Sequence, residues 1–477
     1  MKIILFTISI IFLFNGCVPK IEKIEKIKDS KIEKELIQDL TKFSSNDIEL
    51  KNNWWKNYED SQLNELLNDA IKNAPSIKQL ESKYKIARNL TKAHQSKNIP
   101  NIDFDSNTSR QRYSKNHIYP APLAGSYNNL YQTELALNYD FDFWNERKAL
   151  IKASKNEALA KQALIKVKEL VVYTSITKLY ISWNFKIQKI KRLSTLKRLI
   201  YEKHNILERL YKLGLANKSK INQSNYLSEK INQDILTTKA QIEDIKASIG
   251  IIGGFLPSRL KNLKNPNITK NYKFYVPKNI HLDVISHLPK IAFQKYLLIS
   301  KNEYIKKAKA KFYPNINLKA LVNFTSFSFV DLFTKSSFSP KSEVAFSLPI
   351  FDANKKQENL NAKVNDYNSQ VYAYNQTIIE AINEIVKTLK KIDLNKSNIK
   401  AQNNVMIYKM KNENIEKEIY KLGLKNKISY LDSKIDIQEE KIKSISLQDK
   451  QMQLQINLIK SLGGGYKNKV SNVLSLK

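Results

Sequence analysis

The chain has 477 residues and a formal net charge of +35, from 80 lysines and arginines against 45 aspartates and glutamates. Only 10 glycines and 12 prolines occur in this length, which argues against a many-turned all-β fold and against long disordered tracts. One cysteine and five scattered histidines exclude a disulfide scaffold and a thiolate metal cluster and disfavour a histidine-rich metal site.

The first residues are typical of an export signal. One lysine is followed by an apolar run, Ile3–Phe14, which is too short to cross a bilayer comfortably. Residues 1–16 are therefore predicted to be a signal peptide. The single cysteine, Cys17, resembles the lipidation site of a bacterial lipoprotein, so we expect it to carry acyl chains such as palmitate; the alternative is an ordinary signal peptide with an incidental cysteine. The Lys/Glu-rich residues 17–53 are predicted to be a lipidated tether.

The chain repeats itself with a period of about 210 residues. The sequence Tyr-Lys-Leu-Gly-Leu at Tyr211 recurs at Tyr420, and the Pro-Asn-Ile at Pro100 recurs at Pro314. A period of this length is too long for a solenoid and indicates a duplicated unit. The predicted organisation is a first repeat, a linker, a second repeat and a tail, at residues 54–254, 255–280, 281–465 and 466–477.

Each repeat contains two segments with the alternation of a β-strand. Residues 131–143, 315–325 and 342–350 alternate clearly, and residues 101–113 do so more weakly. Apolar residues on one side and polar residues on the other suit a membrane β-barrel; the alternative is an amphipathic sheet over a soluble core. The aromatic residues within 139–144 resemble an interfacial girdle and favour the membrane.

Two very long helices are predicted, because residues 144–213 and 353–422 contain neither proline nor glycine. Each would be about 105 Å long as one helix. In residues 428–459, eight of ten heptad core positions are apolar, which predicts side-by-side helix packing. Shorter helical segments are predicted to stack end to end in pairs beside the long helices: 61–98 with 219–249, and 283–312 with 428–462.

Four strands are too few to close a membrane barrel, since known barrels begin at about eight strands. An open sheet edge cannot be satisfied in lipid. The strands are therefore expected to form a barrel shared between several copies of the chain. Long helices attached to such a barrel would continue it as a tunnel.

Several motifs recur in order along the two repeats: Trp54–Asp60, Pro100 and Pro314, Tyr139–Trp144, Leu348–Asp352, the two Leu-Gly-Leu turns and Leu462–Gly465. In these motifs, and over almost the whole chain after the signal peptide, the sequence resembles the TolC-like outer-membrane efflux channels, in their lipoprotein branch. The Lys/Glu-rich residues 21–36 and the lysine-rich balance depart from the family pattern.

The resemblance implies a mainly α-helical fold with a membrane β-barrel, built as a homotrimer. Three chains would form a twelve-stranded barrel in the outer membrane, continued by a twelve-helix α-barrel in the periplasm. The implied function is the outer-membrane channel of a tripartite efflux system, exporting drugs or other toxic small molecules with a periplasmic adaptor protein and an inner-membrane pump. The alternative is the conduit of a type I protein secretion system. Apart from the covalent lipid on Cys17, no cofactor, metal or catalytic residue is expected.

The two Leu-Gly-Leu turns are predicted to be hairpin tips, where glycine permits the positive φ that ends a helix. The resemblance implies that they dock the adaptor protein. The alternative is turn chemistry alone, with the leucines as packing contacts of the cap. The residues concerned are Leu213, Gly214, Leu215, Leu422, Gly423 and Leu424.

Asp432 lies nine residues after Gly423, where the family has an acidic ring near the closed periplasmic mouth. Three carboxylates brought together by three-fold symmetry would repel one another unless cations or protons bind. The alternative is an ordinary solvated carboxylate on a helix. Ile428 is the candidate hydrophobic constriction of this gate, although its position on the heptad seam also favours a packing role.

Two other classes of function find little support. The charge of +35 suggests nucleic-acid binding, but the basic residues are spread among Glu and Asn along the helices and no groove-reading motif is present. No phosphate-binding loop, His/Glu metal pattern or Ser/Cys triad signature occurs, so an enzyme is not expected.

Overall fold

The computed structural model describes residues 19–25, 53–268, 288–348 and 350–466, so the predicted signal peptide, Cys17 and most of the tether lie outside the described residues. The chain divides into two compact units, and each contains parts of both repeats. We call the first the strand unit; its described residues are 19–25 and those within 83–161 and 294–374. We call the second the hairpin unit; its described residues fall within 53–82, 162–293 and 375–466.

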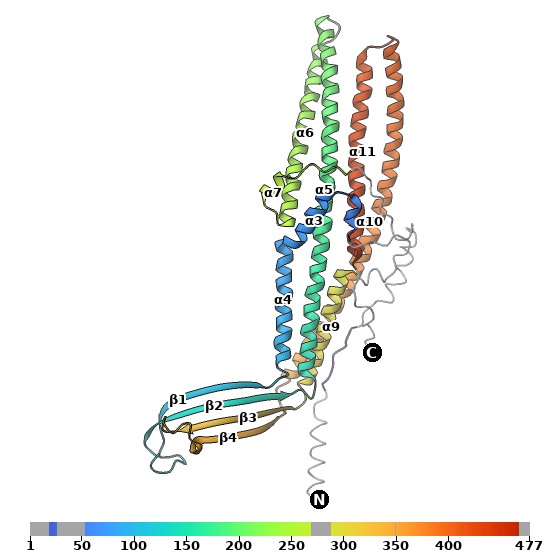
Figure 1. Cartoon of the computed structure of the whole chain (residues 1–477). Helices are drawn as coiled ribbons and strands as arrows, with labels where there is room; N and C mark the ends of the chain where they lie inside the picture. The colour runs from blue at the N-terminus through green and yellow to red at the C-terminus, as the bar shows by residue number, and fades with distance from the viewer. Residues whose placement is uncertain (1–18, 26–52, 269–287, 349, 467–477) are drawn as a thin grey trace. The chain divides into compact units, whose positions relative to one another are not determined.

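The strand unit contains a four-stranded antiparallel sheet in the order β1-β2-β3-β4 (Figure 1). Pairing of β2 with β3 joins the two repeats, and Leu137 lies opposite Ala320 in that pair. In the described part of the chain, β1 and β4 each pair on one side only, so the sheet has two open edges. The strands are β1 (Asn101–Arg112), β2 (Tyr127–Phe141), β3 (Asn315–Ser326) and β4 (Phe338–Ser347).

All four predicted strands are confirmed, but β2 and β4 differ from the prediction by two to four residues at both ends, and β1 and β3 by one residue at one end. β2 begins at Tyr127 rather than Tyr131, because the backbone ladder continues until Tyr127 pairs with Arg112. β4 ends at Ser347 rather than at residue 350, because its partner strand begins opposite Ser347. Backbone hydrogen bonds do not require apolar side chains, so the ladder can extend beyond the alternating pattern or stop short of it.

The two long helices are also confirmed. α5 (Glu146–Lys212) and α10 (Lys355–Lys421) each have 67 residues, and the absence of proline and glycine leaves their hydrogen-bond ladders unbroken. Each begins after an aspartate. The Asp142 carboxylate accepts a hydrogen bond of 3.0 Å from the backbone N–H of Arg147, and Asp352 has the same role at α10. A carboxylate at this end satisfies free N–H groups and is favoured by the helix dipole.

The segment predicted as one helix at 61–98 is in fact two, α3 (Ser61–Asn73) and α4 (Pro75–Ser96). Proline has no N–H and its ring clashes with the preceding turn, so Pro75 ends one helix and starts the next. α6 (Lys218–Gly253) ends at this break, where a Cβ on Gly254 would lie 2.6 Å from Cδ of Pro75.

The second repeat has an equivalent joint. α11 (Lys427–Ser461) ends beside the start of α9 (Pro289–Ala310), where a Cβ on Gly463 would lie 2.9 Å from the Leu288 side chain. Gly463 also has a φ of 80°, which favours glycine in its own right. Contacts of this kind in both repeats support the predicted end-to-end stacking of the short helices. The described residues also include four very short helices: η2 (Trp54–Tyr58), α7 (Pro257–Lys261), η3 (Lys335–Ser337) and η4 (Gly463–Gly465).

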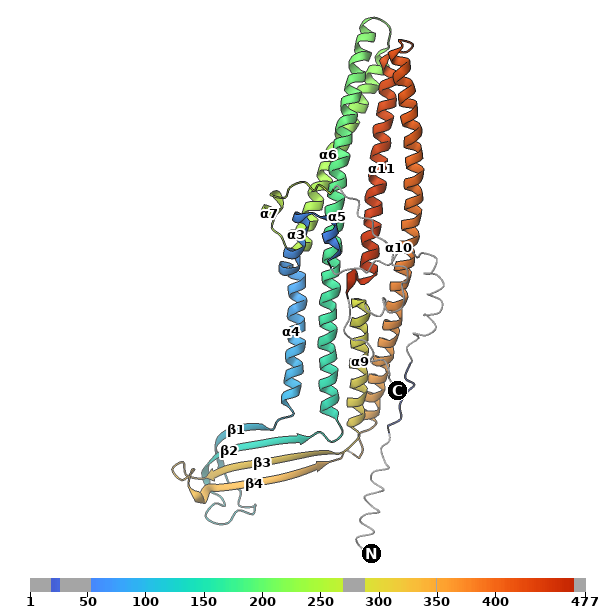
Figure 2. The ribbon, with the colours of Figure 1, turned by 45° about the vertical axis from the view of Figure 1, so that its right-hand side comes forward.

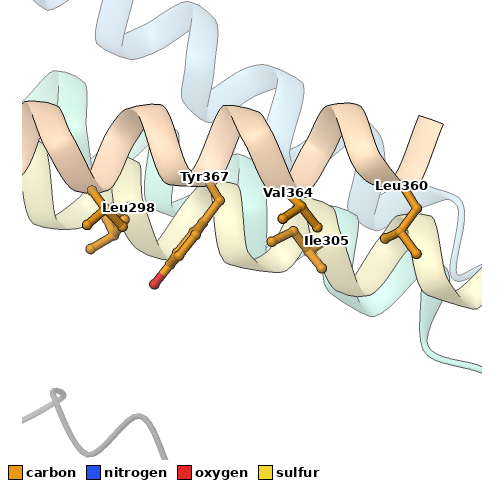
Figure 3. Packing of buried hydrophobic residues seen from close by; sticks show 6 residues of the cluster. Leu298, Ile305, Leu360, Val364 and Tyr367 are labelled. Carbon is orange, nitrogen blue, oxygen red and sulfur yellow. The ribbon is translucent and has the colours of Figure 1, made fainter. Parts of the chain in front are cut away.

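Apolar clusters hold the helices of each unit together. In the strand unit, Leu298 and Ile305 of α9 pack against Leu360, Val364 and Tyr367 of α10 (Figure 3). Burying an aliphatic side chain of this size contributes about 1.5–3 kcal/mol. The cluster therefore contributes much of the stability of this helix pair.

In the hairpin unit, α5 and α6 form one helical hairpin, and α10 and α11 form the other (Figure 2). The cluster Leu193, Leu196, Ile200 and Ile231 joins α5 to α6, and Ile435 and Ile442 of the predicted heptad seam pack against it from α11. Side-by-side helix packing is thus confirmed at this part of the seam. None of the described helices combines the length and the apolar character needed to cross a membrane.

Candidate functional site

Both Leu-Gly-Leu sequences form the tips of the helical hairpins (Figure 2). The N–H of Leu215 donates to the carbonyl five residues earlier at 2.8 Å, and the N–H of Leu424 does the same at 3.1 Å. Gly214 and Gly423 have φ values of 73° and 74°, in the left-handed region that lets a helix end in a tight turn. The two tips therefore share one backbone geometry.

The leucines of the two tips project into solvent. Leu213 and Leu422 are 71% exposed, and Leu215 and Leu424 are 73% exposed. Apart from the glycine and its two neighbours in the chain, no described residue comes within 4 Å of the place that a Cβ on either tip glycine would take. Apolar side chains exposed to this degree are not packing contacts of the cap, and paired apolar groups on a surface are typical of an interaction site.

Sequence analysis did not identify the residues that begin the returning helices. The Asn217 side chain accepts a hydrogen bond of 3.2 Å from the N–H of Lys220 at the start of α6. The Asn426 side chain accepts one of 3.0 Å from the N–H of Ile428 at the start of α11. Asparagine is a favoured residue at this position. Asparagine recurs three residues after each tip glycine, and this recurrence in the sequence could have identified both helix starts.

The second tip has an aromatic support that the first lacks. The rings of Tyr420 and Tyr430 stack with centroids 6.0 Å apart, and Nζ of Lys434 lies 4.5 Å from the Tyr430 ring centre. In the first repeat, the residue equivalent to Tyr430 is Ile221. The two tips therefore present the same leucines on hairpins with different internal packing.

Asp432, the candidate gate residue, is paired within the chain. Its Oδ1 atom on α11 lies 2.5 Å from Nζ of Lys203 on α5. The side chains are 48% and 24% exposed respectively, so water screens their attraction, and a pair of this kind contributes at most about 1 kcal/mol. Asp432 thus has a charged partner within the chain and also keeps contact with water.

Two further ion pairs tie the same end of α11 to its neighbours. Lys427 lies 2.5 Å from Glu202 of α5, and Lys409 of α10 lies 2.5 Å from Asp436. Hydrogen bonds to these carboxylates raise the pKa of both lysines. Sequence analysis singled out Asp432 but none of these partners, because each of them comes from another helix far away in the sequence.

Ile428 lies one turn before Asp432 on α11 and is partly buried. The structure therefore places both gate candidates on one helix, close to the second hairpin tip.

α11 also carries a partly buried carboxylate further along. Asp449 accepts hydrogen bonds from Ser182 of α5 at 3.2 Å and from Gln453 at 3.1 Å. Burial raises the pKa of Asp449, and the two hydrogen bonds and the charge of Lys186 offset this only in part. No cluster of three or more His, Cys, Asp or Glu residues in the described ranges could hold a metal ion.

The segment that follows Cys17 is bound to the strand unit. Gln357 of α10 makes two hydrogen bonds to the backbone of Lys20. Its side-chain oxygen accepts from the Lys20 N–H at 3.2 Å, and its side-chain nitrogen donates to the Lys20 carbonyl at 2.6 Å. The side-chain amide of Gln357 thus binds both the backbone N–H and the backbone carbonyl of Lys20.

A second amide on α10 repeats this arrangement. The Asn368 side chain accepts from the Glu25 N–H at 2.9 Å and donates to the Lys23 carbonyl at 3.0 Å, and Asn365 donates to the Glu22 carboxylate at 2.9 Å. These amides fix the path of residues 19–25 mainly through its backbone. Sequence analysis predicted a tether here but missed its binding residues; the signal was a row of Gln and Asn at helical spacing on α10.

Residues 66–249 and 285–464 match the family model described as outer membrane efflux protein. The chain is 23% identical over 427 residues to the putative multidrug resistance outer membrane protein MdtQ of Escherichia coli, covering 87% of this chain and 88% of that protein. It is 23% identical over 428 residues to the toluene efflux pump outer membrane protein TtgF of Pseudomonas putida, covering 89% and 87%.

The fold is also that of a solved structure. The Campylobacter jejuni CmeC outer membrane channel superposes with a TM-score of 0.82 at 19% sequence identity, covering 95% of each chain. At this level of identity the likeness concerns the fold. It places the four-stranded sheet and the two long helical hairpins of this chain in a known architecture.

Proposed function

This chain belongs to the outer membrane efflux protein family, and from that premise we propose that it is the outer-membrane channel of a tripartite efflux system for drugs or other toxic small molecules. Membership confirms the resemblance seen in the sequence and makes the protein an efflux channel of the outer membrane rather than an enzyme. The similar proteins are named for multidrug and toluene efflux, which favours small-molecule export over type I protein secretion.

The observation that carries this proposal is the open four-stranded sheet. The outer edges of β1 and β4 leave a row of backbone N–H and C=O groups without strand partners among the described residues. In lipid such edges would be costly, so a membrane sheet has to close. We infer a homotrimer in which β4 of one copy pairs with β1 of the next, giving a twelve-stranded barrel with a twelve-helix periplasmic tunnel.

The side chains of the sheet support a lipid-facing surface. Residues directly opposite one another on neighbouring strands share a face. Apolar residues of all four strands gather on one face near the helix-proximal ends of the strands, whereas Ser106, Arg110 and Arg112 continue the same face of β1. Many of its side chains are exposed, which suits contact with lipid. The cross-strand pairs on this face include Ile102 with Leu137, Phe104 with Leu135, Val344 with Leu318, and Phe346 with Ile316.

Asp432 and Ile428 are proposed to line the closed periplasmic mouth. In a trimer, three Asp432 carboxylates would face one another or be held apart by Lys203. The pair with Lys203 holds α11 against α5 and neutralises the carboxylate, so breaking it would let the end of α11 move. Ile428, one turn away on the same helix, would supply an apolar constriction.

The hairpin tips are proposed to dock a periplasmic adaptor protein that connects the channel to an inner-membrane pump. The exposed leucine pairs at 213, 215, 422 and 424 support this role. An apolar groove on the adaptor would bury them and gain about 1.5–3 kcal/mol for each leucine fully buried.

Cys17 is proposed to carry the lipid anchor. The amides of Gln357 and Asn368 would then hold the segment after the acylated residue along α10. The only covalent group expected is this lipid.

Deletion of the gene is expected to sensitise cells to several unrelated toxic compounds, and expression of the full chain to restore resistance. Native mass spectrometry of the detergent-purified protein should give a trimer. Unchanged susceptibility across a broad panel, or a single-chain particle soluble without detergent, would count against the proposal.

A further inference from the structure

A cavity of about 470 Å³ lies in the strand unit where the strands end and the helices begin. It is lined by Lys97, which follows α4, by the last residues of β2, α9 and β4, and by the first residues of α5, β3 and α10. Both repeats therefore contribute to one cavity. None of the roles proposed above uses it.

Four lysines line this cavity: Lys97, Lys307, Lys311 and Lys356. Within the described ranges, none of them forms an ion pair with a carboxylate. Burial and the nearby charge of Lys311, with smaller contributions from Lys97 and Lys363, lower the pKa of Lys307, and Glu146 opposes them only in part. The lysines thus repel one another, and Glu146 balances their charge only in part.

The other charged groups of the lining are largely engaged. Asp142 accepts the backbone N–H groups at the start of α5, and Asp140 accepts from the Asn317 side chain. The Arg147 guanidinium donates to the backbone carbonyls of Lys97 and Asp140. The lining holds five basic side chains, Arg147 and the four lysines, against the three carboxylates of Asp140, Asp142 and Glu146, so the cavity wall carries more positive than negative charge.

One wall of the cavity is aromatic. Trp144 stacks on Tyr313 with ring centroids 4.5 Å apart, and its indole N–H donates to the Pro314 carbonyl at 2.7 Å. Phe141 also lines the cavity. Tryptophan and tyrosine at the end of a membrane strand are typical of the level of lipid headgroups.

The duplication supplies the lysines in matched positions. Lys97 and Lys311 each stand three residues before the proline at a helix-to-strand junction, Pro100 or Pro314. Their side chains line the same cavity because β2 and β3 are neighbours in the sheet. Two copies of one junction thus create a cationic site that neither has alone.

We propose that this cavity binds the phosphate of an anionic phospholipid headgroup, such as phosphatidylglycerol, in the periplasmic leaflet of the outer membrane. The proposal rests on the proposed function, because it requires the strands to lie in the membrane. The phosphate supplies negative charge that the carboxylates of the lining do not provide in full. The stacked Trp144 and Tyr313 beside it give an apolar surface for the glycerol and the first part of the acyl chains.

The test uses the full-length protein in neutral detergent, titrated with phosphatidylglycerol and followed by native mass spectrometry. The variant Lys97→Gln/Lys307→Gln/Lys311→Gln is expected to bind phosphatidylglycerol about tenfold more weakly or worse, because each basic residue near a headgroup contributes substantially. The matched control is Lys390→Gln/Lys396→Gln/Lys400→Gln, which removes the same charge from exposed positions of α10. It should stay within about twofold of wild type, as expected for distant surface lysines.

Equal weakening by the two triple variants would show non-specific attraction to a basic protein and overturn the proposal. So would equal affinity of the wild type for phosphatidylglycerol and phosphatidylcholine. Displacement of the lipid by millimolar inorganic phosphate would assign the site to a free anion instead. If the pocket variant does not fold, the single exposed Lys311→Gln change carries the test. If the protein forms a trimer but shows no lipid preference, only this inference is contradicted. If the protein binds the lipid but neither forms a trimer nor supports efflux, the proposed function is contradicted.

Discussion

The ammonium of Lys203 lies 2.5 Å from the carboxylate of Asp432, although the two residues are 229 positions apart in the chain. The pair joins α5 of the first repeat to α11 of the second. Because both side chains keep contact with water, the pair can be broken at a cost of about 1 kcal/mol. An ion pair of this strength suits the proposed gate, in which α11 is held in one place and has to move when the channel opens.

Asp432→Ala is expected to raise channel conductance or leak in planar bilayers. Loss of about 1 kcal/mol of closed-state stabilisation raises the open population about fivefold. Lys203→Ala should act in the same direction, and the double variant should do little more than either single one. Lys421→Ala, which breaks a pair with Glu418 inside one helix, is the control and should behave as wild type. If Lys203→Ala leaves conductance unchanged while Asp432→Ala raises it, the pair is not the latch.

Leu422→Ser/Leu424→Ser is expected to reduce resistance in a complemented deletion strain toward the level of the empty vector. The exposed leucines contribute little to folding, so the midpoint of thermal unfolding should stay near that of wild type. Leu394→Ser changes an equally accessible leucine elsewhere on α10 and should leave resistance intact. Full resistance in the tip variant would contradict the docking role.

Gln357→Ala/Asn368→Ala is expected to release the segment at residues 19–25 from α10. The two amides make four hydrogen bonds to its backbone, and each contributes about 1 kcal/mol, so trypsin should cleave after Lys20 and Lys23 at least about tenfold faster. Cleavage is followed by mass spectrometry of the released N-terminal peptides. Asn359→Ala removes an amide that bonds its own helix and should not change the rate. Equal rates in all three proteins would show that the segment is held by other contacts.

Asp449 should make stability depend on pH in a defined direction. Because burial raises the pKa of Asp449 in the folded protein, the folded state binds more protons than the unfolded state between the ordinary and the raised value. Stability is therefore expected to fall as pH rises through that window. Asp449→Asn should flatten this slope and raise the unfolding midpoint at neutral pH, measured by circular dichroism in detergent between about pH 4 and 8. An unchanged slope would show that other groups cause the dependence.

The elements of the fold could be predicted because their signals are local. Alternation predicted the strands, the absence of proline and glycine predicted α5 and α10, and the recurring Leu-Gly-Leu predicted both hairpin tips. The break at Pro75 was missed because the helical pattern continues on both sides of it. Strand ends were misplaced where the partner strand, rather than the side-chain pattern, decides how far the ladder runs.

The amino-acid order alone was sufficient for the duplication, the helix and strand types and the family, since each depends on residues that are neighbours in the chain. Which residues contact one another across distant segments of the chain was decided only by the tertiary structure. Which lysine meets Asp432, and why Lys97 and Lys311 line one cavity, depend on segments brought together by packing of α5 with α11 and pairing of β2 with β3. The chain has 80 lysines and arginines, so basic residues occur along almost all of the sequence. Only the tertiary structure determines which few of them lie close enough to act together.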